Sequence, residues 1–216
     1  MKPLNEYYQK RLPLDFYQHH DVCAIAKQLI GKVLVTCFDN TLTAGRIVET
    51  EAYNGVVDKA SHAYGGRLTS RTQVMYEPGG IAYVYLCYGI HHLFNVVTNE
   101  ASTPHAVLIR GIEPVYGMEH MLQRSKKIKF DYSIGRGPGN VTKALDIKVA
   151  HTGTALSEQF LFIADDGWKT PKAIMIATPR IGVDYAAEDA LLPYRFILKG
   201  NPHVTKSPLN KGVSKT

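Results

Sequence analysis

One short stretch, residues 46–53 (RIVETEAY), constrains the fold of this chain more than any other. Its β-branched residues predict a strand, which ends at a turn-forming Asn-Gly pair. Successive side chains of a strand point to opposite faces, so Glu49, Glu51 and Tyr53 are expected on one face. A solvated ion pair is the usual role of a strand glutamate, and this reading stays open for Glu49. Glu51, nearer the ring, is the better candidate for an acid held in a cleft.

The segments before this strand predict a helix and a β-hairpin. Apolar residues recur at helical spacing after Asp21, a residue type suited to an N-cap, and Gly31 suits the helix end. Residues 32–38 form an apolar run, the Asp-Asn pair after it suits a tight turn, and residues 41–53 return as the second strand. The acidic stretch therefore lies on the second arm of a hairpin.

Further elements are expected along the rest of the chain. Strands are predicted at residues 81–90, 93–97, 106–110, 160–164, 180–183 and 195–199, and helical segments at residues 58–62, 117–124 and 141–145. Pro114 is expected to end the strand before it. Residues 1–20 are interpreted as an arm or a short strand on the core, and the polar residues 201–216 as a loose tail.

Composition bounds the class of protein. With 216 residues and 45% hydrophobic content, the chain can bury one sizeable core; residues 1–200 are most simply one domain, although two smaller domains stay open. A net charge of +6 favours a polyanionic partner, but moderately basic surfaces also occur without one. Three cysteines without CxxC spacing indicate a reducing, cytoplasmic setting. No apolar run approaches the roughly 20 residues that span a bilayer, so no membrane contact is expected.

The residues around Glu51 suit a nucleobase lifted out of a duplex. Three tyrosines are expected within reach of this acid: Tyr53, Tyr85 and Tyr88. Two glycine-containing loops, at residues 64–71 and 135–140, offer backbone N–H groups and arginines to phosphates. Aromatic rings stack on bases while such loops hold the backbone. For a single tyrosine, ordinary packing in a strand is the more frequent role, but three near one acid favour base binding.

No metal or cofactor is expected. His91 and His92 are adjacent, so on a strand they point apart and cannot bind one metal from the same face. His62, taken alone, is more often a structural or solvated residue. Arg110 ends a short apolar strand, and a buried arginine needs a carboxylate partner or an anionic ligand.

A set of dispersed motifs occurs in order along the chain: residues 45–53, His62, residues 65–69, Met75-Tyr76, Pro78-Gly79, residues 83–85, Tyr88-Gly89, Asn95, residues 108–110, Glu113-Pro114 and residues 137–139. Their pattern, within a match from about residue 29 to residue 200, resembles the alkyladenine (3-methyladenine) DNA glycosylase family in its bacterial form. The resemblance implies an α+β fold, a single domain with a curved, largely antiparallel β-sheet surrounded by helices.

The resemblance also implies a mechanism. Glu51 corresponds to the general base, which activates a water for attack on C1′ of the damaged nucleotide. Arg110 corresponds to the arginine that helps hold Glu51 and the water, with the main chain of residues 181–183 completing the cradle. An N-alkylated purine is cationic and leaves readily, so one carboxylate suffices, whereas ordinary glycoside hydrolases use two.

The base pocket and the DNA contacts follow from the same resemblance. The substrate-binding residues would be Tyr53 and Tyr85 (opposite walls), His62 (the ring edge) and Asn95 (obstruction of the guanine 2-amino group). The DNA-binding residues would be Tyr88, which fills the gap left by the flipped base, and Ile90, Arg67 and Thr69. One departure is Asn140, because the family commonly has a lysine after Gly-Pro-Gly.

The sequence as a whole predicts a monofunctional DNA repair glycosylase that needs no cofactor. It would act as a monomer, without an obligate protein partner, on double-stranded DNA at the nucleoid. Its substrates would be damaged purines such as 3-methyladenine, 7-methylguanine, hypoxanthine and ethenoadenine. Two alternatives stay open: a non-catalytic nucleic-acid-binding module, which the Glu51–Arg110 pair disfavours, and a hydrolase of RNA or free nucleosides, which Tyr88 disfavours.

Overall fold

One long strand, β2 (Thr41–Tyr53), organises the sheet because three other strands pair with it. On one side β5 (His105–Tyr116) follows β2 along most of its length. The other side is shared, since β1 (Val33–Phe38) pairs with the first half of β2 and β9 (Arg195–Leu198) with its end. All three pairings are antiparallel, and the predicted hairpin of β1 and β2 is confirmed.

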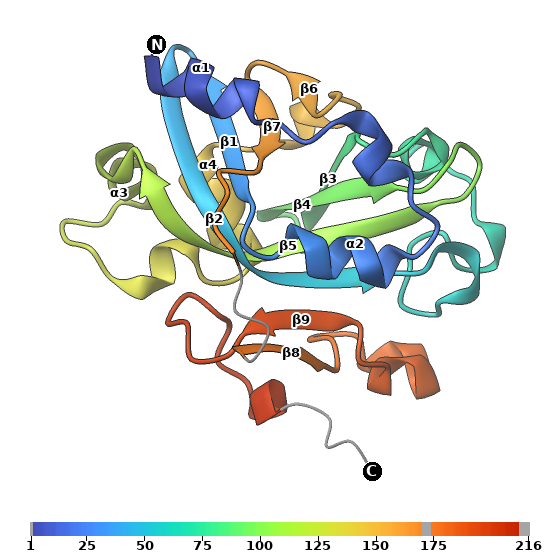
Figure 1. The fold of residues 1–216 in the computed structure, drawn as a ribbon. Coiled ribbons are helices and arrows are strands. Elements are labelled where there is room, and N and C mark those ends of the chain that lie inside the picture. The colour runs from blue at the N-terminus through green and yellow to red at the C-terminus, as the bar shows by residue number, and fades with distance from the viewer. Residues whose placement is uncertain (1, 170–173, 212–216) are drawn as a thin grey trace.

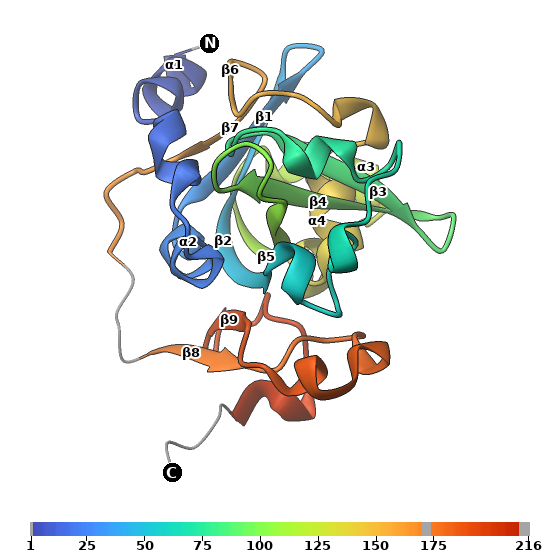
Figure 2. The same ribbon diagram turned by 90° about the vertical axis from the view of Figure 1, so that its right-hand side faces the viewer.

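The remaining strands extend the sheet. The computed structural model describes residues 2–169 and 174–211, and the strand order is β3-β4-β5-β2-β1-β7-β6, with β8 joined to β9. Their bounds are β3 (Ala82–Cys87), β4 (His91–Thr98), β6 (Ser157–Glu158), β7 (Leu161–Ala164) and β8 (Met175–Thr178). Figures 1 and 2 show the sheet curling around the core, with β8 and β9 to one side of the main body.

Short helices pack around this sheet. The α-helices of the described chain are α1 (Lys2–Gln9), α2 (Val22–Leu29), α3 (Met118–Ser125) and α4 (Pro138–Leu145). The α2 helix begins as predicted, because the Asp21 side chain accepts a hydrogen bond from the Ala24 N–H at 3.0 Å. The Thr50 hydroxyl donates to the Ala26 carbonyl at 2.9 Å, so α2 covers the face of β2 that carries Thr50. The opposite face, which carries Glu51, is left for other contacts.

The glycine-rich loop before α4 lies directly against β5. A Cβ at Gly135 would lie 1.9 Å from the Ile112 carbonyl oxygen, so only glycine allows this approach. Gly137 caps the helix with a φ of 87°, and Pro138 occupies the first turn, where a missing N–H costs nothing. The start of α4 is thereby fixed beside the sheet.

Two predictions of extended structure are wrong. Residues 1–20, expected as an arm or a short strand on the core, lie on the core through the buried Leu12 and Tyr17, but they fold as α1 followed by a 3₁₀ turn at Leu14–Gln18. Residues 180–183 form a loop, and the strand that pairs with β9 is β8. In this loop Arg180 makes a buried ion pair with Asp58 at 2.5 Å. A contact with a residue far away in the sequence, and not local strand propensity, fixes this backbone.

Three further boundaries differ from the prediction. Residues 58–62 form turns outside any helix, and β3 ends at Cys87, after which residues 88–90 form the turn into β4. In that turn Tyr88 adopts a left-handed φ of 50°. β5 also continues through Pro114. Because β4 pairs with β5 only along residues 105–108, Pro114 lies on an edge of the described sheet, where proline is tolerated.

Residues 201–211 are not a loose tail. His203 and Val204 are buried, and both the N–H and the hydroxyl of Thr205 donate to a carboxylate of β2. Residues 212–216 of the predicted tail lie outside the described residues. Polarity alone therefore misrepresents this segment, because its polar groups bond to the interior.

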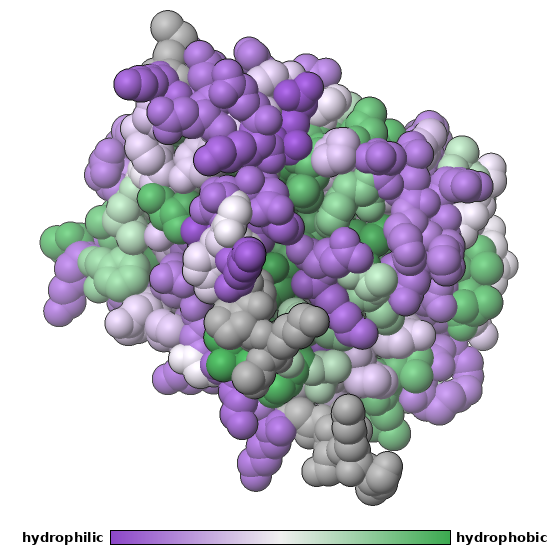
Figure 3. Space-filling view, viewed as in Figure 1, coloured by the Kyte–Doolittle hydropathy of each residue, from purple (hydrophilic) through white to green (hydrophobic). Residues whose placement is uncertain are grey.

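The predicted fold class is confirmed: the protein is a single α+β domain built on a curled antiparallel sheet. Figure 3 shows a mostly hydrophilic face. Ile128, in the loop after α3, is fully exposed. In the part of the chain that is described, no helix has the length and apolar character that a bilayer crossing requires.

Candidate active site

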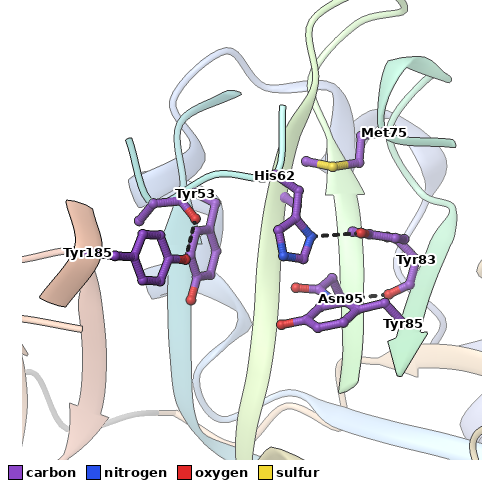
Figure 4. Close-up of a pocket in the computed structure, with 9 residues that line it drawn as sticks. Tyr53, His62, Met75, Tyr83, Tyr85, Asn95 and Tyr185 are labelled. Atoms are coloured by element: carbon purple, nitrogen blue, oxygen red, sulfur yellow. Dashed lines mark hydrogen bonds between the residues drawn. The ribbon is translucent and has the colours of Figure 1, made fainter. Parts of the chain in front are cut away.

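A small aromatic pocket opens into a wide groove beside the end of β2. The pocket holds about 320 Å³ of atom-free space, part of it open to solvent, and is lined by Tyr53, Ala60, His62, Met75, Tyr83, Tyr85, Asn95, Ala106 and Tyr185. Figure 4 shows Tyr53 and Tyr185 on one side and the His62 and Tyr85 rings on the other. These four residues also line the groove, so the two spaces are continuous. A flat, apolar ring with polar edges suits such a pocket.

The Glu51 carboxylate is fully buried and is held by three donors. Its Oε1 accepts a hydrogen bond from the Ile181 N–H at 2.8 Å. Its Oε2 accepts one from the Tyr53 hydroxyl at 2.8 Å and one from Arg110 Nη1 at 3.3 Å. A carboxylate has about four lone-pair positions, so one remains unfilled by the residues that the structure describes. All three donors line the groove, which places the carboxylate directly behind the groove wall.

The Glu49 carboxylate, two residues earlier on β2, is also fully buried, and four donors fill it. Its Oε1 accepts hydrogen bonds from Arg110 Nε at 3.2 Å and Arg195 Nε at 2.7 Å. Its Oε2 accepts from the Thr205 N–H at 2.7 Å and the Thr205 hydroxyl at 2.8 Å. The solvated alternative for Glu49 is therefore wrong, and Arg110 bridges the two acids.

An irregularity in the pairing of β2 with β5 makes room for this cluster. The register shifts on both sides of Glu49, which stands opposite Gly111. A Cβ at Gly111 would lie 3.0 Å from the Glu49 Cβ, so a larger residue would crowd the acid. Bulges of this kind re-aim side chains beside active sites. The local geometry lets Arg110, next to Gly111, reach both carboxylates.

The ionisation of the cluster follows from its contacts. Burial alone would raise the pKa of Glu49, but the charges of Arg110 and Arg195 and the Thr205 hydrogen bonds lower it below its ordinary value. Burial would lower the pKa of Arg110, but Glu51 and Glu49 raise it. Burial and the adjacent Glu51 raise the pKa of Tyr53 well above its ordinary value, so its hydroxyl keeps the proton that it donates to Glu51.

His62 is neutral, and its contacts fix one tautomer. Burial and the charges of Arg71 and Arg67 lower the pKa of His62 to about 4. A guanidinium can only donate, and Arg71 Nη2 lies 3.1 Å from His62 Nε2, so Nε2 is the acceptor. Nδ1 then carries the proton and donates it to the Tyr83 hydroxyl at 2.8 Å (Figure 4). The His62 ring also meets the Tyr85 ring edge to face, with centroids 4.7 Å apart.

Asn95 is the polar residue of the pocket that β4 supplies. Its side chain is buried, and its Nδ2 donates to the carbonyls of Tyr83 at 3.1 Å and Leu93 at 3.3 Å. The two carbonyls belong to paired strands, so these hydrogen bonds hold the Asn95 amide in place. The side chain is therefore a fixed obstacle in the pocket wall.

The residues predicted to contact DNA lie outside this pocket. Tyr88 and Ile90 in the β3–β4 turn are 91% and 70% exposed, and Tyr88 lines the groove. Arg67 and Thr69 lie on an exposed loop, where the Thr72 hydroxyl donates to the Arg67 carbonyl at 2.9 Å and lies 3.1 Å from the Thr69 hydroxyl. The structure thus brings the predicted pocket and acid residues together and leaves the predicted DNA residues at the surface.

Several residues of the site were assigned no role from the sequence, among them Tyr83, Arg71, Tyr185, Arg195 and Thr205. Two of them carried a signal, since Tyr83 precedes Tyr85 by two positions on one strand face and Arg71 lies in the glycine-containing loop of Arg67. Tyr185 and Arg195 carried none, because only the folded chain brings them beside β2.

Comparison with known proteins gives the family. Residues 15–202 match the model of the methylpurine-DNA glycosylase family. The chain belongs to this family. Several bacterial proteins named "Putative 3-methyladenine DNA glycosylase" are similar to it. The protein from Chlamydia felis (strain Fe/C-56) is 46% identical over 87% of this chain and 95% of its own length. The proteins from Bacillus cereus (strain G9842) and Clostridium perfringens (strain 13 / Type A) are 44% and 39% identical over 90% and 91% of this chain and 98% and 99% of their own lengths.

Membership in the methylpurine-DNA glycosylase family confirms the predicted family and the predicted class of enzyme, a hydrolase of N-glycosyl bonds. It also confirms DNA as the partner. The site described above occupies β2, the segment between β2 and β3, β3, β4, β5, the loop after β8 and the start of β9. All of these lie within the matched residues, whereas Thr205 lies beyond them.

Proposed function

We propose that this enzyme removes alkylated or deaminated purines from double-stranded DNA by hydrolysing the N-glycosidic bond, with Glu51 as the general base. One observation carries the proposal: the Glu51 carboxylate is buried, fixed by three donors, and set behind the wall of the groove into which the aromatic pocket opens. The substrates would include 3-methyladenine, 7-methylguanine, hypoxanthine and ethenoadenine.

In the proposed reaction a water at the unfilled position of Glu51 attacks C1′ of the damaged nucleotide. Glu51 accepts a proton from the water while the water oxygen bonds to C1′. The electron pair of the broken glycosidic bond leaves with the purine. A purine methylated at N3 or N7 is cationic and departs as a neutral base, so it needs no general acid. Hypoxanthine and ethenoadenine are neutral, so a proton from solvent would have to reach a ring nitrogen as they depart. Arg110 and the Ile181 N–H orient the carboxylate, because both donate to it.

The aromatic walls support recognition of the damaged base. Tyr53 and Tyr85 would hold the flipped purine between them, with the neutral His62 at its edge. A cationic purine against an electron-rich ring gains about 0.5–2 kcal/mol that neutral adenine does not receive. Asn95, fixed by its two hydrogen bonds, would obstruct the 2-amino group of undamaged guanine.

The exposed β3–β4 turn supports a role on duplex DNA. Tyr88 would enter the helix and fill the space left by the flipped base, as apolar wedges do in other DNA-bending proteins, with Ile90 beside it. Arg67 and Thr69 would contact the DNA backbone, and the net charge of +6 favours that contact. A free nucleoside leaves no gap to fill, so this turn favours a duplex substrate over a nucleoside.

The test is single-turnover excision from duplexes that each carry one of the four lesions, with wild-type protein and Glu51→Gln. The variant is expected to lose about 10²- to 10⁴-fold in rate, the usual contribution of a general base, while duplex binding survives. Glu119→Gln, a change at an exposed glutamate of α3, is the matched control and should excise normally. Excision at the wild-type rate by Glu51→Gln would show that the proposed mechanism is wrong. Binding without excision by the wild-type protein would favour a non-catalytic module instead.

A further inference from the structure

We infer that Glu49 and Thr205 are positioning residues for the catalytic acid: together they set how Arg110 divides its charge between Glu49 and Glu51. The inference rests on the proposed function, because it concerns the base that function requires. It gives residues 203–211, which lie beyond the family match, a part in the active site.

The contacts form one chain from the C-terminal segment to the base. Thr205 donates twice to Glu49 Oε2, and Glu49 Oε1 accepts from Arg110 Nε. The same guanidinium reaches Glu51 Oε2 through Nη1. The Arg110 distances to the two acids, 3.2 and 3.3 Å, are nearly equal, so neither acid holds this cation alone.

Arg195 closes the other side of the cluster. Its Nε donates to Glu49 at 2.7 Å and its Nη1 to Thr178 and Asn210, each at 3.0 Å. Asn210 and Thr205 thus secure Arg195 and Glu49 from the same segment, and the Asn210 amide donates to the Thr205 carbonyl at 2.9 Å. Residues 201–211 are thus hydrogen-bonded to both members of the buried Arg195–Glu49 ion pair.

Few other ionisable groups can influence Glu51. From β5 it faces Arg110, from β2 Tyr53 and Glu49, and from β3 Tyr85. From the segment after β8 it faces Arg180, already paired with Asp58, and Tyr185. Tyr53 and Tyr85 keep their protons, because burial raises the pKa of both well above the ordinary value. Arg110 is therefore the cation in direct contact with Glu51, and Glu49 is its competitor.

Two substitutions should shift the acid–base balance in opposite directions. Thr205→Val removes a donor from Glu49, which then draws Arg110 more strongly and leaves Glu51 less stabilised as an anion. Glu49→Gln removes the competitor, so Arg110 and the unpaired Arg195 stabilise the Glu51 anion more. A defect in folding or packing alone would not produce opposite shifts of the same titration.

The experiment measures single-turnover excision of 7-methylguanine from a duplex across pH 4–9, with unfolding curves for each variant. The acid limb of Thr205→Val is expected to move to higher pH and that of Glu49→Gln to lower pH, by about half a unit or more. Thr205→Ser keeps the hydroxyl and should restore the wild-type profile. If Glu49→Gln does not fold, the Thr205→Val and Thr205→Ser pair decides the question.

A Thr205→Val profile that coincides with the wild type, or shifts of both variants in the same direction, overturns the inference. Glu51→Gln, measured alongside, separates this failure from failure of the proposed function. If Glu51→Gln is inactive while Thr205→Val is unchanged, Glu51 remains the base and only the positioning role is lost. If Glu51→Gln is as active as the wild type, the proposed function fails first.

Discussion

Glu49 and Glu51 are chemically identical side chains on the same strand, yet they share only one hydrogen-bond partner, Arg110, and Glu49 accepts one hydrogen bond more. Four donors fill the Glu49 carboxylate, and two of them come from arginines. Three donors hold Glu51, one of them from an arginine, and all three line the groove. A carboxylate with every lone pair filled can only hold structure in place. A fixed carboxylate with a position left can also bind water and take its proton.

The largest expected effect is a difference in the free energy of unfolding between Glu49→Gln and Glu51→Gln. Glu49→Gln removes the counterion of the buried Arg195 and should lower the free energy of unfolding by about 3–5 kcal/mol, the usual cost of breaking a buried pair. Glu51→Gln should lower it less, because Arg110 keeps Glu49 as a partner. Urea unfolding of both variants measures the difference. Equal losses in the free energy of unfolding would mean that the surroundings of Glu49 and of Glu51 stabilise the fold equally.

A second variant probes the groove beside Glu51 at Tyr88, an exposed residue that lines it. Tyr88→Ser should reduce excision from duplex DNA about tenfold or more. Unstacking the flipped base costs a few kcal/mol, and without the Tyr88 ring in the gap no side chain offsets part of that cost. Its free energy of unfolding should stay within about 0.5 kcal/mol of the wild type, since Tyr88 is 91% exposed. Fluorescence of 2-aminopurine next to the lesion reports flipping, and Tyr132→Ser is the control. An unchanged fluorescence response would contradict the wedge role.

Asn95 combines features of both acids' surroundings: it is buried, as Glu49 is, but it also lines the pocket. Asn95→Ser should raise the excision of undamaged guanine, because the shorter side chain no longer obstructs the 2-amino group. Hypoxanthine is guanine without that group, so its excision should change little. Rates on duplexes with guanine or hypoxanthine at the same position measure this selectivity. A guanine rate that stays at the wild-type level would rule out the steric account.

The smallest effect concerns the pH dependence of stability. The pKa of His62 is about 4 in the fold against 6.5 ordinarily, so between these values the unfolded chain binds more protons than the folded one. Stability is therefore lost as the pH falls from 6.5 toward 4, and His62→Gln should reduce that loss. Unfolding curves at pH 4.5 and 7.5 test it. A variant with the same pH dependence as the wild type would show that His62 is not the group responsible.

Local sequence patterns predicted much of the site. Alternation along β2 brought Glu49, Glu51 and Tyr53 to one side, where Arg110 and the Tyr53 hydroxyl meet the acids. The Asp21 cap and the hairpin of β1 and β2 formed where expected, because caps, turns and strand periodicity depend on neighbours in the sequence. Family resemblance added the assignment of the fold class.

The failures share a different cause. Residues 1–20, residues 180–183 and residues 201–211 were misjudged, and in the last two distant contacts fix the backbone: Arg180 with Asp58, and Thr205 with Glu49. Nothing in the local sequence of these segments marks the partner. The polar composition of residues 201–211 predicts exposure, yet the N–H and hydroxyl of Thr205 and the amide of Asn210 find hydrogen bonds inside the fold, which offsets the cost of burying them.

The sequence by itself determined which residues could do chemistry: two acids and a ring on one strand, an arginine on another, and a set of aromatic residues. Only the tertiary structure decided which acid accepts four hydrogen bonds and which accepts three from the described residues. That decision depends on Arg195, Thr205 and Ile181, which lie more than 100 residues from β2 along the chain and reach it only when the chain folds. The filling of a carboxylate is set by the number of donors packed around it, and that number is a property of the fold.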